Sequence, residues 1–387
     1  MLDGPDMRFA VFGLTLSSSW GNGHATLWRG LIRALCAGGH EVVFFERDVP
    51  YYAEHRDLSA LAGAQLLLYS NWSAVRAEAS KQVSDADVVI ITSYCADACE
   101  ASQLLFASGA VALRVFYDLD TPVTLARLQA GHTVSYIPDG GLATFDLVLS
   151  YTGGVALAEL QQRLGARRVA ALHGHADPAV HAPTPAQSRF ASDLSYLGTF
   201  AVDRQCALER LFIEPARRRP QRRFALGGSG YPGDFPWCQN TWFMRHVAPP
   251  EHPAFYCSSR LTLNVTRGDM AAMGFCPSGR IFEAAACGTP VLTDSWPGLE
   301  HFYTPGSEII VVRTPEDVVD ALDLPGAELA RISRAARERT LEEHSSARRA
   351  AELLSLLEDT QCSMRTAPVR NARQPSASLA AGATRAS

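Results

Sequence analysis

Residues 274–292 read GFCPSGRIFEAAACGTPVL, a turn followed by an apolar helical run, a Gly-Thr-Pro stop and a short strand. Free backbone N–H groups and the helix dipole favour anions at such a helix start. Arg280 and Glu283 lie three residues apart and therefore share one face of the helix. The stretch predicts that Arg280 holds a diphosphate in a two-pronged grip and that Glu283 accepts ribose hydroxyls. The alternative is a surface ion pair that complements the dipole.

Short apolar runs separated by helical patterns extend from this stretch in both directions. Continuous apolar runs are typical of parallel strands covered on both faces. The chain therefore predicts an α/β protein with two doubly wound, Rossmann-like domains that face each other across a cleft. The expected helices are 24–37, 154–164, 203–213, 315–322 and 326–358. The expected strands are 8–14, 41–46, 64–70, 87–93, 113–118, 146–151 and 168–172, then 194–200, 222–228, 243–247, 260–265, 290–294 and 308–312.

One segment breaks this rhythm and separates the two halves. Residues 173–187, HGHADPAVHAPTPAQ, have no periodic pattern and predict an interdomain crossing. We expect a first domain at 1–180, a second at 181–345 and a closing helix at 346–360. Residues 361–387 contain four Arg and no acid, which predicts a disordered tail.

The net charge, the apolar runs and the cysteines of the chain limit the kinds of partner and compartment that we expect. The 387 residues carry a formal net charge of -5, which gives no general attraction to nucleic acid or acidic membranes. No run reaches the ~18–20 apolar residues of a membrane span, so we expect no integral membrane segment. The nine cysteines include no CxxC pair, which disfavours a disulfide framework or a zinc site and favours a cytoplasmic protein.

The segment PSGRIFEAAACGTPVLTDSWPGLEHF (277–302) resembles the nucleotide-sugar-binding segment of GT-B glycosyltransferases, more narrowly the CgeB or spore-maturation type. Ser278, Arg280, Phe282 and Glu283 fit the pattern of that narrower family. The resemblance implies that Glu283 binds the ribose of the donor. The retaining pattern has a further acid eight positions earlier, where this chain has Phe275, so the contact to the donor sugar and the stereochemistry stay open.

Other segments resemble the donor side of the same family. LGTFAVDRQ (197–205) matches a strand, a Gly turn and a basic residue near the diphosphate. FMRHVAPPEHPAFY (243–256) matches the turn whose backbone reads the base, and LNVTRGDM (263–270) ends a strand at the cleft. The donor-site candidates are Gly198, Thr199, Arg204, His246, Val247, Thr266, Arg267, Ser278, Gly279, Arg280, Glu283 and, from the first domain, Gly23.

Two candidates for acid–base chemistry come from the first domain. The turn before helix 24–37 lies over the reaction centre in GT-B enzymes, so His24 becomes a candidate base; a plain helix-capping turn is the alternative. Asp120 follows an apolar strand, where sites occur, although it also reads as a helix cap. Asp118 and Asp120 form an Asp-x-Asp pair whose metal binding is a second choice. For His173, His175 and Asp177, a hinge that lines the cleft is favoured over a metal cluster.

These features predict a metal-independent glycosyltransferase that uses a nucleotide-diphosphate sugar and no cofactor. The acceptor is a small molecule, a glycan or a protein, and a homodimer is compatible with this interpretation. The alternatives are a non-catalytic GT-B-like structural or carbohydrate-binding protein and a GT-B-fold nucleotide-sugar epimerase. A dinucleotide oxidoreductase is disfavoured because no GxGxxG fingerprint follows the first strand.

Overall fold

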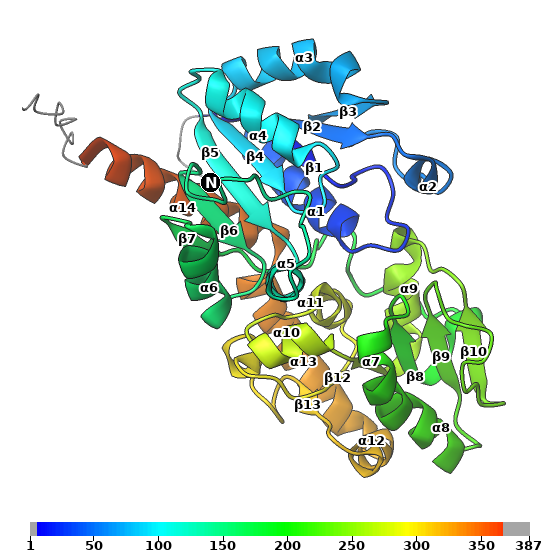
Figure 1. The fold of residues 1–387 in the computed structure, drawn as a ribbon. Helices are drawn as coiled ribbons and strands as arrows, with labels where there is room; N and C mark the ends of the chain where they lie inside the picture. The colour runs from blue at the N-terminus through cyan, green and yellow to red at the C-terminus, as the bar shows by residue number, and fades with distance from the viewer. Residues whose placement is uncertain (1–5, 367–387) are drawn as a thin grey trace, which may run out of the picture.

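Seven parallel strands form the sheet of the first domain, in the order β3-β2-β1-β4-β5-β6-β7, in a computed structural model that describes residues 6–366 (Figure 1). The strand order reverses beside β1, which creates the crevice where ligands of doubly wound sheets bind. The strands are β1 (Arg8–Gly13), β2 (Glu41–Arg47), β3 (Ala64–Tyr69), β4 (Val88–Thr92), β5 (Leu113–Asp118), β6 (Leu147–Ser150) and β7 (Val169–Ala171). The helices are α1 (His24–Ala37), α2 (Pro50–Ala53), α3 (Trp72–Asp85), α4 (Ala98–Ala107), α5 (Thr121–Gln129) and α6 (Val155–Leu164).

Six parallel strands form the second sheet, in the order β10-β9-β8-β11-β12-β13. Its strand order reverses beside β8, so each domain has one crevice of the same kind. The strands are β8 (Ser192–Leu197), β9 (Phe224–Gly227), β10 (Thr241–Met244), β11 (Ser259–Asn264), β12 (Val291–Thr293) and β13 (Ile310–Val311). The helices are α7 (Val202–Leu208), α8 (Glu214–Arg218), α9 (His252–Cys257), α10 (Gly268–Met273), α11 (Gly279–Ala286), α12 (Pro315–Leu322), α13 (Gly326–Glu343) and α14 (Ser346–Thr366). These two sheets confirm the predicted fold class.

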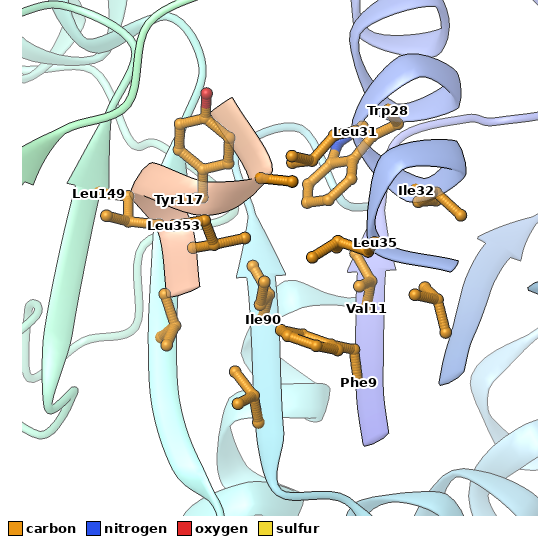
Figure 2. Close-up of a cluster of buried hydrophobic side chains, with 14 of the residues drawn as sticks. Phe9, Val11, Trp28, Leu31, Ile32, Leu35, Ile90, Tyr117, Leu149 and Leu353 are labelled. Atoms are coloured by element: carbon orange, nitrogen blue, oxygen red, sulfur yellow. The ribbon is translucent and has the colours of Figure 1, made fainter. Parts of the chain in front are cut away.

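The last helix belongs to the core of the first domain. Figure 1 shows α14, in orange-red, leaving the second domain and lying against the first. Leu353 of α14 packs in the same buried cluster as Trp28 and Leu35 of α1 and Tyr117 of β5 (Figure 2). The described part of the chain therefore begins and ends in the first domain, with the second domain between.

Two crossings connect the domains, and they lie side by side. Ala176, in the first crossing, forms a parallel bridge with Ser345, in the second. The Ala176 N–H donates to the His344 carbonyl at 2.9 Å, and the Ser346 N–H donates to the Ala176 carbonyl at 2.8 Å. Relative motion of the domains must therefore bend both crossings together.

Several boundaries differ from the sequence-based expectation; the strand expected at 243–247, for example, is β10 at Thr241–Met244. The helix expected at 326–358 is two helices, because the chain turns at 344–345 to cross between the domains. The helix expected at 203–213 is α7 followed by a π-helical turn at Glu209–Ile213. Helix α14 runs to Thr366, so residues 361–366 of the expected tail are helical, and residues 367–387 lie outside the described part. Within 6–366, no helix combines the length and apolar character needed to cross a membrane.

Candidate functional site

A cleft of about 510 Å³ lies between the domains and is lined by residues of both. That volume is typical of a small-molecule site. Apart from His246 and Val247, every residue nominated from the sequence lines it: Gly23, His24, Asp120, Gly198, Thr199, Arg204, Thr266, Arg267, Ser278, Gly279, Arg280 and Glu283. The cleft thus collects residues from the strand ends of both sheets.

Arg280 is held toward the cleft by neighbours on β8, on the turn after it and on β11. Its Nη1 donates to Asn264 Oδ1 at 2.8 Å, and its guanidinium carbon lies 5.1 Å from the centre of the Tyr196 ring. A Cβ added at Gly198 would lie 2.8 Å from Arg280 Nη2, so the missing side chain permits this approach. Among the ion pairs of residues 6–366 none joins Arg280 to Glu283, so the surface-pair alternative is wrong.

The start of α11 opens onto the cleft. Ser278 takes the N-cap position with φ -67° and ψ 138°, and its side chain makes no capping hydrogen bond. Ser278 and Gly279 both line the cleft, while Ile281 and Phe282 are buried. The first N–H groups of a helix have no acceptor within the helix. The dipole and these donors therefore favour an anion beside Arg280.

Two further guanidinium groups border this position. Arg204 Nη2 donates to the Thr199 carbonyl at 2.7 Å. Arg267 Nε lies 3.2 Å from Asp203 Oδ2 and stays partly exposed. The second-domain wall therefore presents three cationic side chains to one part of the cleft, an arrangement that suits a diphosphate.

Thr266 lines the cleft but uses its hydroxyl elsewhere. Its Oγ1 donates to Asp294 Oδ1 at 2.8 Å, and its N–H donates to the same carboxylate at 3.1 Å. Burial raises the pKa of Asp294, and the Thr266 donors offset part of that effect. The Thr266 hydroxyl thus stabilises the chain after β11 and is not free to donate to a ligand, although the residue lines the cleft.

Glu283 has two polar neighbours that the sequence did not reveal. The Tyr256 hydroxyl donates to Glu283 Oε2 at 3.3 Å, and His252 Nδ1 lies 3.8 Å from the same oxygen. His252 Nε2 lies 3.1 Å from the Val247 carbonyl, which can only accept, so Nδ1 carries the lone pair. Burial lowers the pKa of His252, which keeps the ring neutral. Only the pattern of a His and a Tyr four residues apart at a short helix start could have nominated them.

His24 and Asp120 meet on the first-domain wall. His24 Nε2 lies 3.7 Å from Asp120 Oδ2. Asp120 makes no side-chain capping bond to α5, which overturns the capping alternative for its carboxylate. Asp118 is fully buried behind it, accepts from the Asp120 N–H at 3.1 Å, and has its pKa raised to about 6 by burial. The Asp-x-Asp pair therefore presents one carboxylate to the cleft.

Tyr94 is a further cleft residue that the sequence analysis missed. Its φ of 62° is left-handed, an unfavourable conformation for a tyrosine that often marks a functional site. Its ring centre lies 5.6 Å from that of His24, and burial together with the Asp120 charge raises its pKa to about 12. Its position just after β4, at the carboxyl edge of the sheet, was the available signal.

The turn before His24 is fixed by a buried carboxylate. Glu46, at 1% exposure, accepts from the N–H groups of Leu16 and Ser17 at 2.7 and 2.8 Å. It also accepts from the hydroxyls of Thr15 and Ser17 at 2.9 and 2.6 Å. Asn22 Oδ1 then accepts from the Ala25 N–H at 3.2 Å at the start of α1. These bonds place Gly23 and His24 at the cleft.

His246 and Val247 do not reach the cleft lining. The His246 ring packs on Trp20 of the first domain with 4.7 Å between ring centres. Val247 is buried, and its carbonyl is occupied by His252. These positions therefore join the domains and support the Glu283 region, which differs from the base contact expected of them.

His173, Asp177 and Phe275 make contacts that connect parts of the protein to one another. His173 Nδ1 lies 2.8 Å from the Tyr151 carbonyl, and Asp177 pairs with Arg33. Phe275 has a left-handed φ of 48°, and a Cβ at Gly154 or at Gly298 would meet its ring at 2.6 Å. The Phe275 ring therefore fills the seam between a first-domain turn and a second-domain turn, where it replaces the acid of the retaining pattern.

Comparisons with known proteins agree with this architecture. Residues 204–355 match a family model described as glycosyl transferase-like. No curated protein matches the chain by sequence. Sucrose-phosphate synthase from Thermosynechococcus elongatus is similar with a TM-score of 0.67 at 14% identity, covering 92% of this chain and 100% of that one. The chain has the GT-B fold.

Two other structures with the GT-B fold were solved with ligands. An α-glucosyltransferase in complex with UDP-glucose and DNA has a TM-score of 0.68 at 13% identity, covering 91% of this chain and 100% of that one. Anabaena HepE in complex with UDP and glucose has a TM-score of 0.63 at 12% identity, with the same coverage. At such identities the likeness establishes the fold, and function depends on the residues of this GT-B cleft.

Proposed function

We propose that the protein is a glycosyltransferase that moves a hexosyl or related group from a nucleotide-diphosphate sugar to a hydroxyl of an acceptor. The observation that carries this proposal is the composition of the cleft. Three guanidinium groups and Glu283 lie on one wall, and the His24–Asp120 pair lies on the other. The glycosyl transferase-like match of residues 204–355 and the UDP and UDP-glucose complexes of similar structures support it.

The diphosphate would bind at the start of α11. Arg280, Arg204 and Arg267 would balance the charge that develops on the leaving group, together with the free N–H groups of the helix. This supply of positive charge supports a reaction without a metal ion. The prior orientation of Arg280 by Asn264 means that little reorganisation accompanies binding.

The ribose would bind one helical turn further along. A ribose carries two adjacent hydroxyl donors, and the cleft offers two acceptors, the Glu283 carboxylate and the His252 Nδ1 lone pair. The Tyr256 hydroxyl also donates to this carboxylate, at 3.3 Å from Oε2. This pairing favours ribonucleotide donors over deoxyribonucleotide donors.

The transfer forms a bond between the acceptor oxygen and the anomeric carbon and breaks the bond from that carbon to the phosphate oxygen. In an inverting transfer His24 takes the acceptor proton, and Asp120 stabilises the resulting imidazolium. In a retaining transfer a donor phosphate oxygen would take the proton instead. Closure of the cleft would exclude water and so limit hydrolysis of the donor.

The test is calorimetric titration with UDP and other nucleoside diphosphates in EDTA, followed by transfer assays with the matching sugars. Glu283→Gln should weaken binding roughly 10–100-fold, because a charged hydrogen-bond acceptor is worth about 1.5–3 kcal/mol. Glu300→Gln, an exposed position, is the matched control. If no nucleotide binds the wild-type protein, the proposed function is wrong; if activity requires added metal, the metal-independent mechanism is wrong.

We also propose that the protein belongs to the CgeB type and that it is cytosolic. The Ser-x-Arg-x-Phe-Glu form supports the former, and nine free cysteines, several of them buried, support a reducing compartment. No specific observation favours the epimerase or the non-catalytic alternative.

A further inference from the structure

Three side chains from three separate segments converge beside the cleft, and two of them line it. His181 comes from the first interdomain crossing, His252 from the start of α9 and Glu283 from α11. Atoms able to ligate a metal on these residues all lie within 4.8 Å of one another. Among residues 6–366 this is the only group of three or more His, Cys, Asp or Glu side chains with that geometry.

Three of the four histidine nitrogens in this cluster lack a hydrogen-bond partner among the described residues. Both ring nitrogens of His181, and Nδ1 of His252, are buried without a hydrogen bond in the described part of the chain. His181 is only 5% exposed. Buried polar atoms are usually paired, so a free nitrogen on each of these two rings is open to a bound species.

The chemistry of the cluster selects a cation. The Nε2–H of His252 donates to the Val247 carbonyl, so the Nδ1 lone pair of His252 faces the Glu283 carboxylate at 3.8 Å. Two electron-pair donors that face each other repel unless a cation or a hydrogen-bond donor lies between them.

We propose that His181, His252 and Glu283 form a binding site for a zinc-class divalent cation in the nucleotide-free protein. Two imidazoles and one carboxylate form a ligand set typical of zinc, and a fourth position would face the cleft. Tetrahedral ligands at ~2.1 Å from zinc lie about 3.4 Å apart, so small side-chain rotations would complete the site. Magnesium and calcium prefer all-oxygen ligands and fit poorly.

Zinc at this site competes with the nucleotide. This second part rests on the proposed function, because Glu283 and His252 are also the acceptors proposed for the ribose. His181 belongs to the cluster but not to the residues that line the cleft. Loss of His181 therefore separates zinc binding from contact with the nucleotide.

The test is titration of the metal-stripped full-length protein with zinc chloride, against a chromophoric zinc chelator. The wild-type protein should bind one zinc ion, and His181→Phe, which keeps an aromatic ring, should weaken binding at least 10-fold. Glu283→Gln should weaken it as well. His132→Ala, at an exposed histidine in the first domain, should bind zinc as the wild-type protein does. Equal zinc affinity in the wild-type and His181→Phe proteins would overturn the site.

Protein folding is checked separately by circular dichroism and by thermal melting with and without zinc. Zinc should raise the melting temperature of the wild-type protein and of His132→Ala, but not that of folded His181→Phe. If His181→Phe does not fold, Glu283→Gln and His252→Gln provide the same comparison, and wild-type affinity in both overturns the site.

Titration with UDP, first in EDTA and then in zinc, tests the competition. Zinc should weaken UDP binding in the wild-type protein and leave it unchanged in His181→Phe. No UDP binding in EDTA combined with one tight zinc ion would refute the proposed function and leave the metal site standing. UDP binding that zinc does not weaken would overturn the overlap of the two sites.

Discussion

Gly198 determines where the Arg280 guanidinium can lie. The Gly198 N–H donates to the Gly227 carbonyl at 2.8 Å, so the residue continues the sheet at the carboxyl end of β8. A side chain there would meet both Arg280 Nη2 and the Tyr196 hydroxyl at 2.8 Å. The absence of one methyl group thus lets a strand end support the proposed diphosphate contact.

Gly198→Ala should therefore displace Arg280 and lower kcat/KM while the protein stays folded. We expect a loss of roughly 10-fold or more, since one misplaced charged contact is worth about 1.5–3 kcal/mol. The measurement is steady-state kinetics with the donor identified by titration. Gly233→Ala is the control, because an added Cβ there meets no atom within 4 Å. Equal kinetics in both variants would refute this role of Gly198.

Asp118 gives the protein a predictable pH dependence. Burial raises its pKa from 3.8 to about 6, so the folded state keeps the proton that the unfolded state releases. The stability contributed by this group is fully present below about pH 4 and is lost as the pH rises through about 6.

Asp118→Asn removes that dependence. Relative to Asp118→Asn, the wild-type protein should lose about 2.5 kcal/mol of unfolding free energy between pH 4 and pH 7, since each unit of pKa shift is worth about 1.4 kcal/mol. Urea unfolding at a series of pH values measures this difference, with the exposed Asp139→Asn as control. A constant difference between the two curves contradicts the raised pKa.

Sequence reasoning worked best for residues at strand ends and helix starts. Arg280 was nominated because it stands at a helix start, and Asp120 because parallel strands bring their carboxyl ends to one edge; both line the cleft. His252 and Tyr256 were missed because their role arises from contact with Glu283, 27 residues from Tyr256 along the chain. Glu46 was missed because a buried carboxylate in a strand cannot be told from an exposed one by pattern alone.

Helix α14 is the element whose sequence most misled the prediction. The helical periodicity runs on through residues 326–358, and no Pro or Gly marks the break at 344–345. The break exists because the helix must leave one core and enter another, which is a tertiary constraint. Ala350, Leu353, Leu354 and Leu357 pack in the core of the first domain.

Leu353→Ala should accordingly destabilise the first domain by about 2–5 kcal/mol, the usual range for a large core residue cut to alanine. Urea unfolding followed by tryptophan fluorescence provides the measurement, since Trp28 lies in the same cluster (Figure 2). Ser355→Ala, on the exposed side of the helix, should change little. Equal stability of the two variants would mean that α14 does not support this core.

At the scale of the whole molecule, the domains touch through Phe275. The Gly153 N–H donates to the Phe275 carbonyl at 2.9 Å, and the ring packs between Gly154 and Gly298. Comparison with the retaining pattern suggested a missing contact to the donor sugar. The structure directs this side chain into the interdomain seam instead.

Phe275→Glu should therefore not restore a sugar contact. It should lower the melting temperature and the transfer rate, because a carboxylate in the seam loses apolar packing and part of its hydration. Phe275→Leu, which stays apolar, should keep most of both. A transfer rate above wild type in Phe275→Glu, measured with the identified donor, would show that the side chain reaches the sugar.

The return of α14 to the first domain makes the second domain an insertion. The two segments that connect it to the first domain lie side by side and are bridged through Ala176 and Ser345. A domain whose two ends are adjacent can be replaced as one unit without a change in the path of the chain through the first domain. The half that would choose the nucleotide could thus diverge, or be replaced in the laboratory, while the half that would receive the acceptor kept its own core.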